Sequence, residues 1–376
     1  ITGRYGHRFG YECNLSDRTN GLPLEEETIA EVFKTNGYRT AAIGKWHLGS
    51  RDEQHPNNRG FDLFYGMKAG GRDYFYNEKK SDRPGDERNL LLNDRQVKFE
   101  KYLTDAFSEK AVEFINESSQ PFMMYLAYNA VHTPMQATDE DMAKFEGHPR
   151  QKLAAMTYAL DRGVGTVIRG LKDSGKFDNT LIFFLSDNGG ATTNQSSNYP
   201  LKGFKGNKFE GGHRVPYFVV WKNGIPAGKP YDGLVSSLDI FATAIDAASI
   251  SKTRNRLDGV SLLPYLKGKK GEPHKVLYWR KMDTRAIRSG DYKLIITHGV
   301  DSVLYNIRRD PEEMNNLINK EPDLYRKLAK KLAKWEKNEC IEPSWLEEGW
   351  RKITNRYHQQ LMHNEIKTAQ DLYKKK

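Results

Sequence analysis

Amphipathic helical patterns alternate with short apolar runs through the first two thirds of this 376-residue chain. The run at residues 181–185 contains only Leu, Ile and Phe, and nearly continuous apolar runs are typical of strands buried in a parallel sheet. Strand patterns separated by helical ones favour an α/β fold, because parallel neighbours need a crossover that a helix usually supplies. We therefore predict a mostly parallel sheet sandwiched by helices.

The first helix is expected at residues 24–36. Its first turn would contain Glu25, Glu26 and Glu27, because acidic side chains interact favourably with the helix dipole there. The helix would end at Asn36-Gly37. The other predicted helices lie at 104–116, 153–173 and 236–248, and the predicted strands at 38–43, 121–126, 181–185 and 217–221.

The pattern changes near residue 270, after a segment rich in Gly, Lys and Pro. Short strand-like runs follow at 276–279, 286–288, 292–296 and 303–305, and an amphipathic helix is expected at 323–337. Runs of this spacing are typical of an antiparallel sheet. We expect an α/β domain at 1–270, a smaller C-terminal subdomain of antiparallel sheet and helix at 271–340, and a polar tail at 341–376 that is partly docked.

Composition limits the classes of partner. Lys and Arg number 59 against 49 Asp and Glu, and the net charge of +10 attracts anionic ligands over long range. The basic residues are dispersed, without zinc-finger spacing or an Arg-rich arm, so we expect no nucleic-acid partner. No apolar run is long enough for a membrane helix, so no membrane insertion is expected. Ile1 follows no targeting region, which leaves the localisation open.

The segment 44–49 comes directly after the predicted strand at 38–43. It places Lys45 and His47 two residues apart, and strand alternation would send both side chains to one face. Ligands of open α/β sheets bind at the carboxyl ends of the strands. A fixed cation beside an imidazole suits a substrate with an anionic ester. The alternative is a buried structural His beside a solvated Lys.

The segment 186–190 follows the strand at 181–185 and contains Asp187, Asn188 and two glycines. Carboxylate and amide oxygens are ligands for hard cations such as Ca²⁺ or Mg²⁺. The alternative is an ordinary turn, since Asp, Asn and Gly all favour turns.

Two more polar residues complete the candidate site. His132 follows the strand at 121–126 and could act as an acid or base near neutral pH, or be a structural histidine. Lys205 lies in the Gly-rich segment 203–212 and could point at an anion, although Gly-rich loops are common. No phosphate-binding Gly motif follows a strand, which disfavours nucleotide binding. Together these segments suit a divalent cation and a tetrahedral oxyanion ester, but they supply no nucleophile.

Over roughly residues 1–320, the chain resembles the type I sulfatases of the alkaline-phosphatase-like superfamily. Residues 37–48 are similar to the second signature of the family, and Thr2-Gly3-Arg4 to the end of its first. Other similar segments are 58–62, 186–190, 210–216, 257–260, 288–294 and 304–306. The segments 46–49 and 130–134 most resemble N-acetylgalactosamine-sulfatase-like and bacterial polysaccharide sulfatases.

The resemblance implies an alkaline-phosphatase-like fold, with the catalytic domain at 1–270. It implies that a hydrated formylglycine removes sulfate from a sulfated glycan. It also implies one divalent cation, Ca²⁺ rather than Mg²⁺, held partly by Asp187 and Asn188 and acting as a Lewis acid. A periplasmic, secreted or lysosomal location would follow.

The resemblance also implies roles for the other candidates. Lys45 and Lys205 would neutralise the sulfate oxygens. His132 would donate a proton to the leaving sugar oxygen, and His47 would assist the release of sulfate. The candidates for sugar recognition are Arg72, Tyr74 and His213.

The chain departs from the family pattern in three places. The nucleophile of the family, a Cys or Ser converted to formylglycine, would precede Thr2, and Cys13 lies on the wrong side of the signature. An earlier strand with two acidic metal ligands is also missing, and His213 stands where a small apolar residue is usual. We therefore expect a fragment that lacks a central strand and is inactive alone, whereas the full-length protein is active.

Two other functions stay open. One is a phosphoester or phosphonate hydrolase of the same superfamily. The other is a catalytically silent glycan-binding homologue, against which the presence of all six site residues argues. The sugar, the sulfate position and the oligomeric state are not read from the sequence.

Overall fold

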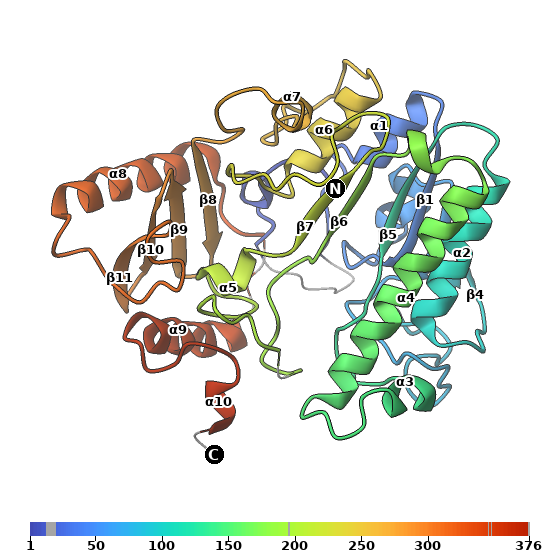
Figure 1. The fold of residues 1–376 in the computed structure, drawn as a ribbon, viewed down its shortest axis with the longest axis horizontal. Coiled ribbons are helices and arrows are strands. Elements are labelled where there is room, and N and C mark those ends of the chain that lie inside the picture. Colours follow the sequence, from blue (N-terminus) through green and yellow to red (C-terminus); the bar gives the residue numbers. More distant parts are fainter. Residues whose placement is uncertain (13–19, 195, 345, 347, 375–376) are drawn as a thin grey trace.

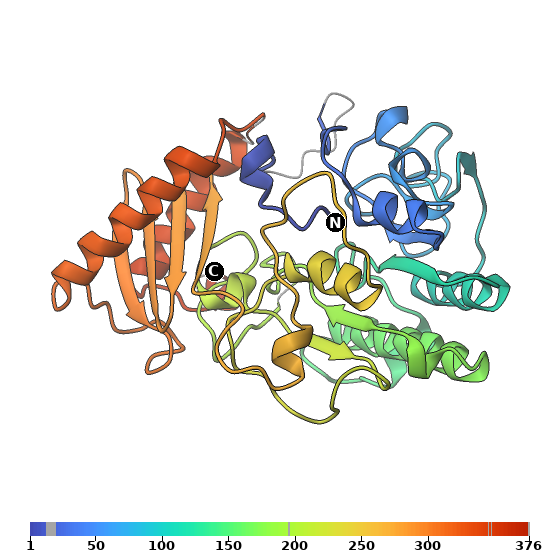
Figure 2. The same ribbon diagram turned by 90° about the horizontal axis from the view of Figure 1, so that it is seen from above.

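The structure is a computed structural model that describes residues 1–12, 20–194, 196–344, 346 and 348–374. A larger part, with a five-stranded sheet and its helices, lies at one end of the long axis, and a smaller part, with a four-stranded sheet, at the other (Figures 1 and 2). A two-stranded sheet lies between them. Cys13 falls outside the described residues.

The five-stranded sheet has the order β4-β3-β2-β1-β5. Its strands are β1 (Arg39–Lys45), β2 (Leu63–Met67), β3 (Leu91–Leu92), β4 (Arg95–Gln96) and β5 (Phe122–Ala127). β1 is parallel to β2 and β5, whereas β3 and β4 add antiparallel. The sheet is therefore mixed, with a parallel centre.

Helices cover both faces of this sheet, as predicted. Side chains alternate along β1, so that Ala41 and Ile43 pack with α2 (Leu103–Glu117) and α4 (Gln151–Asp173), while Ala42 packs with α1 (Ile29–Thr35) on the other face. The other α-helices that precede the smaller sheet in the chain are α3 (Asp139–Ala143), α5 (Glu210–His213), α6 (Asp239–Ala247) and α7 (Leu263–Leu266).

The first helix begins later than predicted, at Ile29 instead of residue 24. Thr28 is the N-cap: its side chain accepts a hydrogen bond from the Glu31 amide, and the Glu31 carboxylate accepts one from the Thr28 amide. This capping box satisfies two backbone donors that would otherwise have no partner, and so it fixes the start of the helix.

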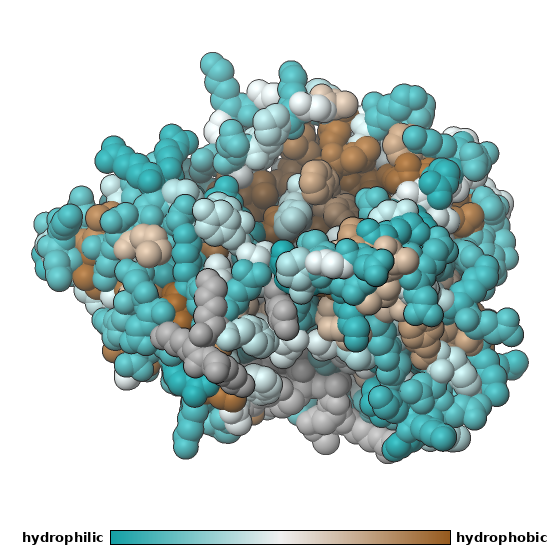
Figure 3. Space-filling model, turned by 60° about the horizontal axis from the view of Figure 1, so that its bottom comes forward, coloured by the Kyte–Doolittle hydropathy of each residue, from teal (hydrophilic) through white to brown (hydrophobic). Residues whose placement is uncertain are grey.

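The strands β6 (Ile182–Leu185) and β7 (Tyr217–Val220) are exceptions to the predicted mostly parallel sheet. They are antiparallel to each other, and within the described residues they join neither of the other sheets. Large apolar side chains on these strands and on β5 are exposed, namely Tyr125, Phe184, Phe218 and Val220. Figure 3 shows apolar side chains in a recessed area of the face it draws, surrounded by hydrophilic ones. The predicted additional central strand stays a prediction.

The smaller sheet is antiparallel, with the order β11-β10-β9-β8. Its strands are β8 (Val276–Lys281), β9 (Thr284–Ser289), β10 (Tyr292–Thr297) and β11 (Asp301–Asn306). α8 (Pro322–Glu339) covers one face with Leu328, Leu332 and Trp335. This is the subdomain that the sequence predicts, although the predicted domain boundaries stay a prediction.

The range predicted as a polar tail contains two helices, α9 (Glu348–Met362) and α10 (Asp371–Lys374). Near its end, α9 places Leu361 and Met362 in a core with the smaller sheet and with Phe204 and Phe209. None of the helices in the described part of the chain is long and apolar enough to cross a membrane.

We expect Leu361→Ala to lower the free energy of unfolding by about 2–5 kcal/mol, because it leaves a cavity where Leu361 is fully buried. Urea denaturation would measure the change. Trp350→Ala, at a position of the same helix that is 52% exposed, should change stability by about 0.5 kcal/mol or less. Equal effects of the two substitutions would show that α9 is not docked as described.

Candidate active site

Lys45 and His47 lie where β1 ends. Lys45 is the last residue of the strand, and the chain then turns, with His47 at a φ of +52° and its amide donating to the Lys68 carbonyl (3.0 Å). The orientation of His47 is therefore set by this turn and not by strand alternation. Gly44 makes the turn possible, because it has a φ of +107° and a Cβ there would lie 2.0 Å from the Ala127 oxygen.

His132 lies in a turn beyond β5, where its amide donates to the Asn129 carbonyl (2.8 Å). Its Nδ1 is 2.8 Å from the Thr133 carbonyl. A carbonyl only accepts, so this hydrogen bond requires the proton on Nδ1 and leaves Nε2 available. Burial lowers the pKa of His132, and the charges of Lys205 and Lys45 lower it further.

The two loops that carry Asp187, Asn188 and Lys205 are joined through their backbones. The Gly189 amide donates to the Gly212 carbonyl (3.0 Å), and the Lys205 amide donates to the Gly190 carbonyl (3.0 Å). A Cβ at Gly189 would lie 1.8 Å from the Gly211 oxygen, so only glycine permits this approach. Lys205 is thereby held beside the candidate cation loop, with an exposed side chain.

Electrostatic interactions link the candidate residues from four separate segments. Burial lowers the pKa of Lys45, Asp187 counteracts this effect, and Lys205 adds to it. Burial lowers the pKa of His47 to about 4, with further contributions from Lys45, Lys205 and His132. The structure therefore brings together Lys45, His47, His132, Asp187 and Lys205, and Asn188 adjoins them in sequence.

The donor set fits a hard cation in part. The Asp187 carboxylate is exposed and, within the described residues, accepts no hydrogen bond, so its oxygens are available. The described residues contain no group of three or more His, Cys, Asp or Glu side chains that could hold a metal ion. Since Ca²⁺ takes six to eight oxygen ligands, Asp187 and Asn188 would supply only some of them.

Two predicted sugar-binding residues are engaged elsewhere. The Arg72 guanidinium is fully buried and pairs with the Asp82 carboxylate at 2.7 Å. Tyr74 is fully buried, with its hydroxyl 2.6 Å from the Asn129 oxygen and 2.9 Å from the His132 oxygen. Neither side chain is exposed in this structure, and a contact of Arg72 or Tyr74 with the sugar stays a prediction.

His213, the third predicted sugar contact, lies against the smaller sheet. Its partly buried ring stacks on Trp279, with the ring centres 4.5 Å apart and the planes at 25°. Burial and the Lys293 charge lower the pKa of His213 to about 4. Its contact with a sugar stays a prediction.

A buried charge cluster that was not predicted from the sequence supports the site. Lys293 Nζ lies 2.9 Å from Glu210 Oε1 and 3.0 Å from Glu313 Oε1, and the Glu210 amide donates to Glu313. Burial alone would raise the pKa of Glu210, but Lys293 holds it well below its usual range. The cluster ties α5, which contacts the cation loop, to the smaller sheet. A lysine between apolar residues of a strand was the one available signal.

Comparison with known proteins identifies the family. The model described as Sulfatase matches residues 1–250, and that of the N-sulphoglucosamine sulphohydrolase C-terminal region matches residues 205–338. The chain belongs to the sulfatase family. Members of this family bind a divalent metal, which agrees with the oxygen donors at 187 and 188.

Relatives of known sequence are longer than this chain. The uncharacterized sulfatase YdeN of Escherichia coli (strain K12) is 37% identical over 74% of this chain and 54% of its own length. The N-acetylgalactosamine-6-sulfatase of Canis lupus familiaris is 31% identical over 78% of this chain and 60% of its own. The chain thus spans about half to two thirds of the length of these relatives.

A solved structure confirms the fold. Ps i-CgsB in complex with k-i-k-neocarrahexaose has a TM-score of 0.85 and 35% sequence identity, over 97% of this chain and 86% of that one. The predicted family is therefore confirmed, as is the α/β fold with a smaller antiparallel subdomain.

We expect Lys45→Met to raise the pKa of His47 from about 4 toward its ordinary value of 6.5, because the repulsion between ammonium and imidazolium is removed. NMR titration of the imidazole signals would measure this shift. Lys68→Met is a matched control, since the Lys68 charge lowers the pKa of His55 instead. An unchanged His47 titration in Lys45→Met would contradict the described geometry.

Proposed function

We propose that this chain forms most of a sulfatase that hydrolyses a sulfate ester on an oligosaccharide. One observation carries the proposal: Lys45 and His132 interact electrostatically with the exposed carboxylate of Asp187, and both histidines interact with Lys45 and Lys205. A binding protein would need the cations, but not two imidazoles beside them, whose pKa values are lowered by burial and further by the same lysines. The nucleophile is proposed to be a formylglycine outside the described residues.

The lysines bind and orient the sulfate group. A unit charge about 4 Å from an anionic oxygen contributes about 4 kcal/mol at an effective dielectric constant near 20. Lys45 is half-buried and fixed at the end of β1, so its charge is already oriented before the substrate arrives. Lys205 approaches from the neighbouring loop.

His132 protonates the leaving oxygen. The hydrogen bond of Nδ1 to Thr133 directs Nε2 away from the backbone, and the proton on Nε2 passes to the sugar oxygen as the sulfur–oxygen bond breaks. The bound sulfate supplies negative charge near an imidazole whose pKa is lowered in the free protein. Substrate binding therefore favours the protonated form that the reaction requires.

Asp187 and Asn188 hold part of a Ca²⁺ site. When bound, the cation supplies Lewis-acid stabilisation of the nucleophile and of the sulfate oxygens. The remaining ligands would come from outside the described residues.

The substrate class is proposed to be a sulfated oligosaccharide of the neocarrahexaose type. Ps i-CgsB, which is 35% identical over most of both chains, was solved with such a hexasaccharide. The net charge of +10 agrees with a polyanionic glycan.

We expect the full-length protein to release sulfate from k-i-k-neocarrahexaose, and Lys205→Met to lower kcat/KM by about 10²–10³-fold, because one stabilising charge is lost. Ion chromatography would measure the sulfate. Lys222→Met, at an exposed lysine paired with Asp178, is the control and should change little. Preferred hydrolysis of a phosphate ester, or equal effects of the two substitutions, would refute the proposal.

We expect Asp187→Asn to weaken Ca²⁺ binding to the full-length protein by at least about 10-fold, because one anionic ligand is lost. Calorimetric titration of the chelator-treated protein with Ca²⁺ would measure this loss without any substrate. Asp178→Asn, which removes an exposed carboxylate elsewhere, is the matched control. Unchanged affinity in Asp187→Asn would place the cation elsewhere.

A further inference from the structure

The loop between β2 and β3, residues 68–90, passes both active-site histidines. A Cβ at Gly70 would lie 2.6 Å from His47 Cε1, and a Cβ at Gly71 would lie 3.3 Å from His132 Nδ1. The glycine pair therefore leaves room for the two imidazoles beside the backbone of this loop. The residues that follow the pair determine where the loop is held.

Tyr74 connects this loop to the turn that carries His132. Its hydroxyl lies 2.6 Å from the Asn129 oxygen and 2.9 Å from the His132 oxygen. The His132 amide donates to the same Asn129 oxygen, so the Tyr74 hydroxyl and the His132 amide both contact one carbonyl of the turn. Because Tyr74 is fully buried, water does not replace this contact.

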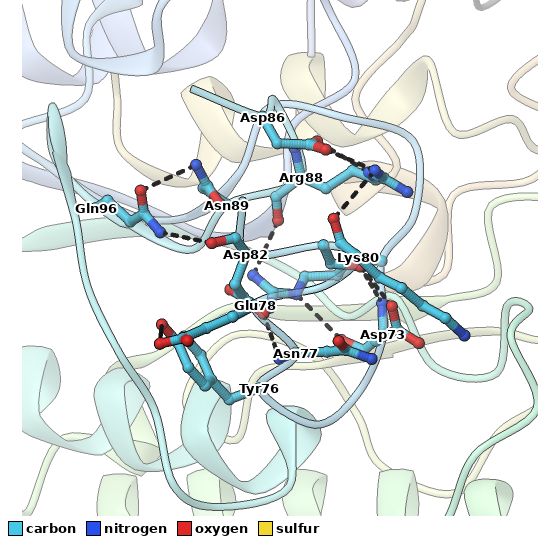
Figure 4. A network of polar contacts seen from close by, with 12 residues as sticks. Asp73, Tyr76, Asn77, Glu78, Lys80, Asp82, Asp86, Arg88, Asn89 and Gln96 are labelled. Carbon is cyan, nitrogen blue, oxygen red and sulfur yellow. Dashed lines mark hydrogen bonds and ion pairs between the residues drawn. The ribbon is translucent and has the colours of Figure 1, made fainter. Parts of the chain in front are cut away.

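A buried polar network fixes the segment that contains Tyr74. Arg72 donates to both oxygens of Asp82 (2.7 and 2.8 Å) and to the carbonyl of Arg88 (2.9 Å). Figure 4 shows Asp82 within this network, where its carboxylate also accepts from the Asn77 amide (2.7 Å). Buried ion pairs contribute little net stability, but the fixed geometry of this one holds the segment in a single position.

The neighbouring residue adds two further anchors. The Asp73 carboxylate accepts from Ser81 Oγ (2.7 Å) and from Gln136 Nε2 (2.8 Å). The Tyr74 amide donates to Gln136 Oε1 (2.8 Å). Tyr74 is therefore held from both sides, by its own loop and by the segment that follows His132.

We propose that Tyr74, held by the Arg72–Asp82 ion pair, is a positioning residue that orients His132 for proton transfer to the leaving sugar oxygen. This inference rests on the proposed function. Proton transfer depends steeply on the position of the donor, so a small displacement of the turn reduces the rate without affecting substrate binding. Tyr74 itself touches no substrate, because it is enclosed by protein.

The test compares two leaving groups in the full-length protein. Tyr74→Phe removes only the hydroxyl. We expect kcat to fall about 10-fold on a sulfated oligosaccharide, whose alkoxide must be protonated, with KM little changed. With an activated aryl sulfate, whose phenolate leaves without protonation, kcat should fall less than about 2-fold.

Tyr102→Phe is the matched control. Tyr102 is buried, stacks on Tyr74 at 5.4 Å and 15°, and donates its hydroxyl to the Gln136 carbonyl (2.9 Å) instead of to the His132 turn. It therefore loses an equivalent buried hydrogen bond in the same cluster. We expect both substrates to react at the wild-type rate in this variant.

A second measurement does not depend on activity. In NMR spectra of the chain 1–376, Tyr74→Phe should shift the imidazole nitrogen signals of His132, whereas Tyr102→Phe should leave them unchanged. Equal kinetic losses on both substrates, or equal spectra for the two variants, would overturn the inference. An inactive wild-type protein with the expected NMR difference would instead refute the proposed function and leave the positioning contact supported.

Discussion

The parallel pairing of β1 with β2 and β5 is the constraint on which the rest of the site depends. Gly44 pairs with Gly66 on one side and with Ala127 on the other, so the three strands end at the same edge. Lys45 therefore lies at the same edge as the loop that begins after β2 and the turn that carries His132. Because Gly44 has no side chain, its backbone can approach the Ala127 oxygen at a distance where a Cβ would clash. This close approach links the strand pairing to the turn at His47.

The smaller sheet contributes to the site through buried charge. Lys293 on β10 neutralises Glu210 and Glu313, and Glu210 begins the short helix whose glycines lie against the cation loop. Burial raises the pKa of Glu313, although the charge of Lys293 opposes this effect. A charge removed there would leave its partners buried without compensation, so the two parts of the molecule depend on each other.

Sequence reasoning succeeded where periodicity or position along a strand decides the outcome. β1, β5, α2 and α4 lie within two residues of their predicted bounds, and the site candidates at strand ends converge. It failed where the direction of a strand and its neighbour in the sheet matter. An apolar run indicates that a strand is buried but not which strand pairs with it, so β6 and β7 were assigned to the wrong sheet. Residue type likewise does not show where Arg72 and Tyr74 point. α9 was missed although Ile353, Tyr357 and Leu361 recur at helical spacing, because polar residues dominate this segment.

The local charge of the proposed site favours an anionic ester more directly than the net charge does. Lys45 and Lys205 lower the pKa values of both imidazoles beyond the effect of burial, whereas Asp187 counteracts this effect at Lys45 and His132. Burial and this repulsion both lower the pKa values of the two imidazoles in the free protein. An anionic ester relieves the repulsion where it binds, whereas a neutral sugar leaves it in place. The same interaction that lowers the histidine pKa values therefore favours a charged ester and, once that ester is bound, favours the protonated imidazole beside it.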